Sequence, residues 1–88
     1  MEFEWDPDKA ESNWRKHDVS FETAAGVFLD PFILEIDAED HGDEMRYNVL
    51  GLVADRLLHV TYTMRGDVHR IISARAAEPY EQRQYHEI

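Results

Sequence analysis

The sequence contains no cysteine, which excludes disulfide bonds and zinc sites built from thiolates. Its five histidines show neither His-x-x-His nor HExxH spacing, so we expect no bound metal and no cofactor. Walker, GxGxxG and GxSxG motifs are also absent. No apolar run approaches the ~20 residues of a membrane span, and the acidic N-terminus does not resemble a secretory signal. We therefore expect a cytoplasmic protein that does not contact a membrane.

Basic residues are scarce: nine Lys and Arg stand against nineteen Asp and Glu, which gives a net charge of −10. Nucleic acid repels such a chain at long range, whereas a basic protein partner attracts it. Hydrophobic residues make up 43% of the sequence, with two Trp, four Tyr and four Phe, which favours a folded chain. A length of 88 residues predicts one domain that spans residues 1–88.

Four of the nine basic residues lie within residues 56–75, namely Arg56, Arg65, Arg70 and Arg75. Two runs rich in β-branched and aliphatic residues flank Arg65-Gly66-Asp67, and Gly and Asp favour a tight turn. The pattern predicts a β-hairpin.

The sequence leaves the length of the hairpin loop open. A two-residue loop would place Tyr62 and Met64 beside His69, and a three-residue loop would place Thr61 and Thr63 there.

The remaining sequence alternates between helix and strand signals. Asp6-Pro7 begins a predicted helix over residues 7–17, and Ser20 caps a second helix that ends at Asp30-Pro31. We expect further elements at residues 3–5 (a short strand), 32–37 and 47–53 (strands) and 79–86 (a helix), with a polar loop over 37–44. This order predicts an α+β fold: two N-terminal helices packed on a mostly antiparallel sheet of about four strands, with a short C-terminal helix.

The predicted helices also suggest which side chains form the core. Ala10, Asn13, Trp14 and His17 share one face of the first helix. We expect Trp14, Phe21, Ala25 and Phe28 to pack against one face of the sheet. Asp18 follows the first helix and is one of the few residue types that tolerates a left-handed conformation there.

The arginine-rich hairpin is the candidate site. Several guanidinium groups on one sheet face could bind phosphate, and His59 or His69 could transfer protons near neutral pH. The alternative is that the arginines are surface residues paired with the abundant carboxylates, and that the histidines are half-exposed strand residues.

A set of residues spread over nearly the whole sequence forms a familiar pattern, namely Trp5-Asp6, Lys9-Ala10, Asn13, Lys16-His17, Val19, Phe21, Ala24, Val27-Phe28, Asp30-Pro31, Arg46-Tyr47, Gly51, Tyr62-Thr63, Arg65-Gly66-Asp67, Arg70 to Arg75, Glu81 and Tyr85. In these residues the sequence resembles the BrnT family. It implies the toxin of a bacterial type II toxin–antitoxin pair, a RelE-like fold, and a metal-independent ribonuclease that inhibits translation. It also implies a BrnA-like antitoxin partner of ribbon-helix-helix type, and contact with DNA only through that antitoxin.

The resemblance implies roles for particular residues. Catalysis falls to Arg75, Arg70, Arg65 and His69, with Glu81 or Tyr85 as weaker candidates for proton transfer. RNA binding falls to Lys9, Lys16, Arg46 and Tyr85. The sequence departs from the family where Asp18 replaces the usual Gly, and where residues 76–82 replace a basic run. The acidic replacement favours an alternative function, a non-cleaving co-repressor that acts with its antitoxin.

Overall fold

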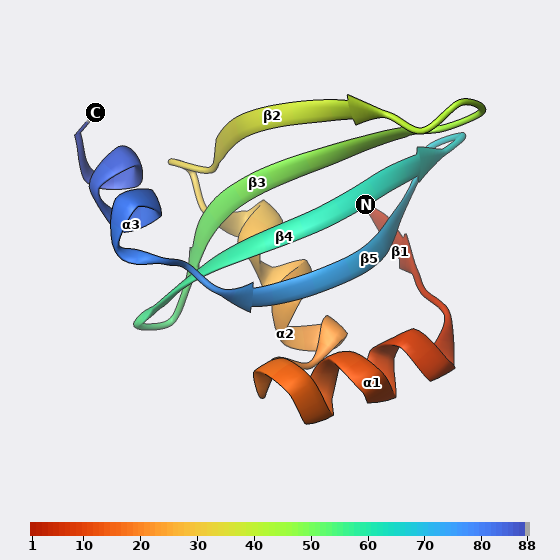
Figure 1. Ribbon diagram of the computed structural model, residues 1–88, viewed down its shortest axis with the longest axis horizontal. Coiled ribbons are helices and arrows are strands. Elements are labelled where there is room, and N and C mark those ends of the chain that lie inside the picture. Colours follow the sequence, from red (N-terminus) through yellow and green to blue (C-terminus); the bar gives the residue numbers. More distant parts are fainter. Residues whose placement is uncertain (88) are drawn as a thin grey trace.

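The computed structural model describes residues 1–87, which form five strands and three α-helices around one mixed sheet (Figure 1). The elements are β1 (Glu2–Glu4), α1 (Pro7–His17), α2 (Phe21–Ala25), the 3₁₀ helix η1 (Gly26–Leu29), β2 (Leu34–Asp40), β3 (Met45–Val53), β4 (Arg56–Arg65), β5 (Val68–Ala76) and α3 (Pro79–His86). The α+β class is confirmed. The sheet differs in detail from the predicted, mostly antiparallel sheet of about four strands: it has a fifth strand, the strand order is β1-β5-β4-β3-β2, and β1 runs parallel to β5.

The fifth strand arises from the N-terminus. β1 pairs with the first half of β5, with Phe3 opposite His69 and Glu4 opposite Arg70. Its three residues alternate, as the sequence indicated, but alternation over so short a stretch carries no information about the partner strand. The pairing joins the N-terminus to a strand 66 residues further along the chain.

The β4–β5 hairpin is confirmed, and its register combines both alternatives that the sequence left open. The turn has two residues, Gly66-Asp67, with Gly66 at φ 60°, so Met64 lies opposite His69. A bulge beside Thr61 then shifts the pairing by one residue, so that Thr61 lies opposite Ser73. The bulge leaves Ile72 without a partner on β4.

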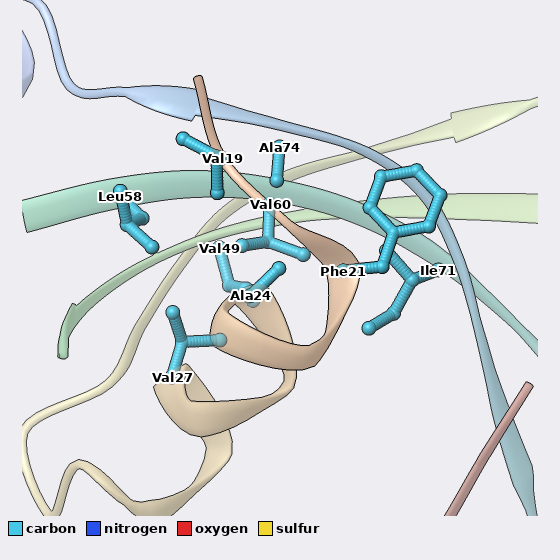
Figure 2. Close-up of a cluster of buried hydrophobic side chains, with 9 residues drawn as sticks. All are labelled: Val19, Phe21, Ala24, Val27, Val49, Leu58, Val60, Ile71 and Ala74. Atoms are coloured by element: carbon cyan, nitrogen blue, oxygen red, sulfur yellow. The ribbon is translucent and has the colours of Figure 1, made fainter. Parts of the chain in front are cut away.

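The two faces of the sheet are covered differently. One face packs against α2 and η1 and holds the main core, which consists of Val19, Phe21, Ala24, Val27, Val49, Leu58, Val60, Ile71 and Ala74 (Figure 2). Successive strand residues point to opposite faces, so Leu50 points away from this core. It joins a smaller cluster with Leu57 and Tyr85 of α3. Helix α3 thus covers only one end of the second face, which we call the open face.

The predicted core is correct for Phe21, which is fully buried, and for Ala25 and Phe28, which pack against the core. The prediction for Trp14 is wrong, because its side chain is 54% exposed. Asn13 takes the inward position instead, and the next residue lies about 100° further around the helix.

Asn13 attaches α1 to the edge of β5. Its Nδ2 donates to the Ala74 carbonyl at 2.8 Å and to the Val19 carbonyl at 2.9 Å, and its Oδ1 accepts from the Ala74 amide at 3.0 Å. The side chain therefore satisfies the backbone groups of an otherwise open strand edge. Figure 1 shows α1 lying alongside β5.

The predicted helix boundaries are largely confirmed. The Asp6 side chain accepts from the Asp8 amide, and Asp18 follows α1 in a left-handed conformation with φ 57°. Ser20 caps α2, but the second helix changes to 3₁₀ geometry at Gly26. The predicted polar loop over residues 37–44 is partly wrong, because β2 continues to Asp40.

Candidate functional site

Basic side chains from four elements meet in a hollow of about 210 Å³ at the turn end of the β4–β5 hairpin. We call it the hairpin-tip hollow. Its lining residues are Asp6, Lys9, Glu44, Arg46, Thr63, Arg65, Arg70 and Ile72. Four of the predicted site residues, namely Lys9, Arg46, Arg65 and Arg70, are therefore together.

Strand pairing explains why these residues meet. Arg70 lies opposite Thr63 in the β4–β5 ladder, and alternation places Arg65 on the same face as Thr63. The Thr63 hydroxyl donates to the Met45 carbonyl at 2.7 Å, which brings in the start of β3 and Arg46. Lys9 enters from α1.

Two of the four cations in the hollow are paired with carboxylates. Arg70 bonds to Glu4, and Arg46 Nε lies 2.9 Å from Glu44. The hydrogen bond from Arg46 lowers the pKa of Glu44. Lys9 and Arg65 have no carboxylate oxygen within 4.0 Å among residues 1–87. Within residues 1–87, Lys9 and Arg65 are thus cations without a direct ion pair, although the charge of Arg65 helps to lower the pKa of Glu44.

A second hollow of about 250 Å³ adjoins the first and is lined by Lys9, Ser12, Asn13, Lys16, His17, Ile72 and Ser73. We call it the α1 hollow. Lys9 and Ile72 line both hollows. Lys16, predicted to bind RNA, lies here. The two hollows form a basic surface suited to phosphate groups.

A family model described as "ribonuclease toxin, BrnT, of type II toxin-antitoxin system" matches residues 5–81. The chain belongs to the BrnT family. The match contains every residue that lines the two hollows. A search of the curated proteins found no match. Membership in this family implies a ribonuclease toxin with an antitoxin partner.

Two general features of this BrnT family member concern membranes and metals. Within residues 1–87, no helix is long and apolar enough to cross a membrane. The same part of the chain holds no group of three or more His, Asp or Glu side chains placed to bind a metal ion.

Arg75 lies outside both hollows, at the α3 end of the open face. Its guanidinium forms two bonds to Glu81, with Nη1–Oε1 at 2.7 Å and Nη2–Oε2 at 3.1 Å. Glu81 is only 1% exposed. Burial raises the pKa of Glu81, but the Arg75 hydrogen bond and the Glu78 amide outweigh it and lower the pKa overall. Arg75 thus fits the alternative interpretation, in which the arginines are surface residues paired with carboxylates.

His59 lies beside this pair, with Nε2 3.8 Å from Glu81 Oε2. Burial, followed by the charge of Arg75, lowers the pKa of His59. The His59 imidazole is therefore mainly neutral at neutral pH, and it lies next to the Arg75–Glu81 ion pair.

His69 points to the helix-covered face and away from Arg70. Its ring contacts Phe3, Phe28 and Tyr62, with centroid distances of 5.5, 4.8 and 5.4 Å. Its Nδ1 is buried and has no hydrogen-bond partner among residues 1–87, and burial lowers the pKa of His69. The structure therefore does not bring His69 together with the arginines.

Tyr85 also lies away from the hollows. Its hydroxyl donates to Asp30 Oδ2 at 2.6 Å. Burial and the Asp30 hydrogen bond raise the pKa of Tyr85 to about 12. This tyrosine connects α3 to the end of η1, where it holds the fold together.

The sequence reasoning missed two carboxylates in the hairpin-tip hollow, Asp6 and Glu44. Asp6 was assigned only as a helix cap, and Glu44 only as part of an acidic loop. The available signal was spacing, because Glu44 precedes Arg46 by two residues and therefore shares its side of the chain. These carboxylates add oxygen atoms that can accept a hydrogen bond or a proton in the hollow.

Proposed function

We propose that this chain is a metal-independent endoribonuclease of RelE-like fold that inhibits translation by cleaving RNA in the hairpin-tip hollow. Residues 1–88 would act as one toxin domain in the cytoplasm. The observation that supports this is the convergence of Lys9, Arg46, Arg65 and Arg70 in one hollow. In a chain of net charge −10, such local positive charge is suited to a polyanion.

The chemistry follows from the groups in the hollow. The ribose 2′-hydroxyl attacks the adjacent phosphorus, and its proton passes to a carboxylate, for which Glu44 and Asp6 are the candidates. The bond between phosphorus and the 5′-oxygen breaks, and that oxygen takes up a proton. Arg65 and Arg70 stabilise the negative charge on the pentavalent phosphorus, since preorganised cations act where charge develops. The products would carry a 2′,3′-cyclic phosphate and a 5′-hydroxyl.

Arg75 and His69, predicted to be catalytic, face other parts of the structure. Their roles stay predictions, and their variants form a natural comparison with those of Arg65 and Arg70. If Arg75→Ala abolishes cleavage while Arg70→Ala does not, the reactive site lies at the α3 end of the open face.

The test is cleavage of a long single-stranded RNA in EDTA by purified protein. Arg70→Ala should reduce the rate by about 10²–10³, the usual effect of removing one preorganised donor. Arg70→Lys should recover only part of the rate, because an ammonium cannot reproduce the planar fork of arginine. Arg56→Ala is the matched control, since the Arg56 guanidinium donates to the Asp18 carbonyl, at 3.4 Å, at the other end of the hairpin.

Two results would contradict the proposal. If Arg65→Ala and Arg70→Ala both cleave RNA at the wild-type rate, the hairpin-tip hollow takes no part in the reaction. Loss of all cleavage in EDTA, with recovery on addition of a divalent ion, would rule out a metal-independent mechanism.

We further propose that the antitoxin is a BrnA-like, basic ribbon-helix-helix protein, and that this chain contacts DNA only through it. The outer edge of β2 supports a basic partner, because β2 ends the sheet and carries the carboxylates of Glu35, Asp37, Glu39 and Asp40. An exposed strand edge can pair with another chain. The antitoxin should raise the melting temperature of this protein, and Asp40→Lys with Glu39→Lys should weaken the complex.

A non-cleaving co-repressor is the second candidate function. It is favoured by the Arg75–Glu81 and Arg70–Glu4 pairs, which neutralise two of the three predicted catalytic arginines. Expression without antitoxin separates the two functions: growth arrest that Arg70→Ala relieves supports the ribonuclease, and normal growth together with promoter repression by the complex supports the co-repressor.

A further inference from the structure

The α1 hollow adjoins the hairpin-tip hollow, yet the reaction proposed above uses only the latter. We propose that the α1 hollow is a second phosphate subsite, so that the substrate is a single RNA strand whose backbone runs from the hairpin tip along α1. This inference rests on the proposed function, because it specifies the substrate of the same site.

The spacing of the two lysines sets the length of this path. Lys9 and Lys16 are seven residues apart on α1, two helical turns, so they lie on the same side of the helix. At 1.5 Å per residue the separation is roughly 10 Å. A stacked strand advances about 3.4 Å per nucleotide, so roughly three nucleotide steps separate the two cations. A strand that contacts both hollows therefore needs about four nucleotides.

The charges on α1 are distributed unequally. Arg15, which does not line either hollow, pairs with Glu11. Lys9 and Lys16 have no carboxylate within 4.0 Å in the described part of the chain. Only the side of α1 that lines the hollows thus keeps its positive charge. Ser12 and Ser73 add hydroxyl groups that can donate to phosphate oxygens.

The floor of the α1 hollow is attached to the sheet. Asn13, which is 6% exposed, fixes α1 to Ala74 through two hydrogen bonds. The bulge releases Ile72 from strand pairing, and its side chain lines both hollows. The attachment thus sets the position of α1 against the sheet, and Lys9 and Lys16 keep the backbone separation that the helix gives them.

Net charge favours a single strand over a duplex. A duplex would bring a second charged backbone against a protein of net charge −10, whereas one strand can follow the basic surface alone.

The test measures binding of fluorescein-labelled 2′-O-methyl oligouridylates of two to six nucleotides, which lack the attacking hydroxyl. Fluorescence anisotropy should show a stepwise gain in affinity near four nucleotides for the wild type. Lys16→Ala should remove this step and leave binding of the dinucleotide unchanged. It should also reduce the slope of log K against log salt by about 0.7, the value for one phosphate contact with a single strand.

Arg15→Ala is the matched control, because Arg15 adjoins Lys16 in sequence but lies outside the hollows. It should bind oligonucleotides of every length like the wild type, and Lys16→Arg should retain the step. The inference is overturned if Lys16→Ala and Arg15→Ala behave alike, if affinity does not rise near four nucleotides, or if the wild type binds none of the oligonucleotides.

Cleavage of a long RNA separates this inference from the proposed function. If the wild type cleaves but Lys16→Ala leaves the length dependence unchanged, the subsite is refuted and the ribonuclease stands. If the wild type does not cleave but the Lys16-dependent step is present, the subsite stands and the proposed catalysis is refuted.

Discussion

Replacement of Asn13 by Ala tests how α1 is held against the sheet. The Asn13 amide makes three buried hydrogen bonds, two to Ala74 and one to Val19. Each buried hydrogen bond contributes about 1 kcal/mol net, and the backbone groups left without partners add a desolvation cost. We therefore expect the variant to lose about 3 kcal/mol of its free energy of unfolding, a large share of the stability of a small domain.

Urea denaturation followed by circular dichroism measures this loss as a lower midpoint at an unchanged m-value. Hydrogen exchange provides an independent measurement. Where exchange occurs through local opening, the Ala74 amide should exchange faster in Asn13→Ala than in the wild type, while amides in the β3–β4 ladder should keep their protection.

Ser12→Ala is the control, since Ser12 precedes Asn13 on α1 and has no role in the attachment to β5. A loss of less than about 1 kcal/mol in Asn13→Ala would refute the reasoning, because α1 would then be held by its apolar contacts alone. Asn13→Asp should be at least as destabilising as Asn13→Ala, since it places a carboxylate against two carbonyl oxygens.

Three further predictions concern stability. The ion pair with Arg75 lowers the pKa of Glu81 in the folded state, so the stability that ionised Glu81 contributes is present above the usual pKa of 4.5. This stability is lost as the pH falls through the pKa of the folded state. In urea melts at a series of pH values, Glu81→Gln should therefore lose less stability in acid than the wild type. Gly51→Ala should cost about 1–3 kcal/mol in thermal unfolding, because its new Cβ would lie 2.7 Å from Cβ of Val27. Phe28→Ala should cost about 3 kcal/mol, at the low end for a partly buried aromatic residue, and a loss below about 1 kcal/mol would show that the ring does not pack as described.

The elements of this fold were predictable where local chemistry decides them. Asp6, Ser20 and the Gly66-Asp67 turn carry their signals in their own side chains or backbone freedom, and the structure confirms all three. The parallel pairing of β1 was not predictable, because three alternating residues do not specify a distant partner. Trp14 was misplaced because hydrophobicity suggested burial, whereas the hydrogen-bonding capacity of Asn13 determines which side of α1 faces the sheet.

The candidate site was predictable in its charges but less so in its geometry. Basic residues are scarce in this acidic chain, and their concentration in the β4–β5 hairpin indicated a phosphate-binding site. Arg65 and Arg70 were identified in this way, and they do share a hollow with Lys9. The sequence pattern could not separate them from Arg75, which lies at the α3 end of the open face, and it could not indicate that Arg70 and Arg75 pair with Glu4 and Glu81, which lie on other elements. The face on which His69 lies depends on strand register, which the sequence had left open.

The parallel pairing of β1 with β5 has a consequence for synthesis of the chain. Glu4 and Arg70, which bond across this pairing, are 66 residues apart. Contacts of such large sequence separation form late in folding, after the local hairpins. During translation, the ribosome must release the β4–β5 hairpin before β1 can dock and bring Lys9 to the arginines. A nascent chain therefore has only Lys9 and Arg46 of the four cations until Arg65 and Arg70 have emerged, so the basic hollow is completed late in translation.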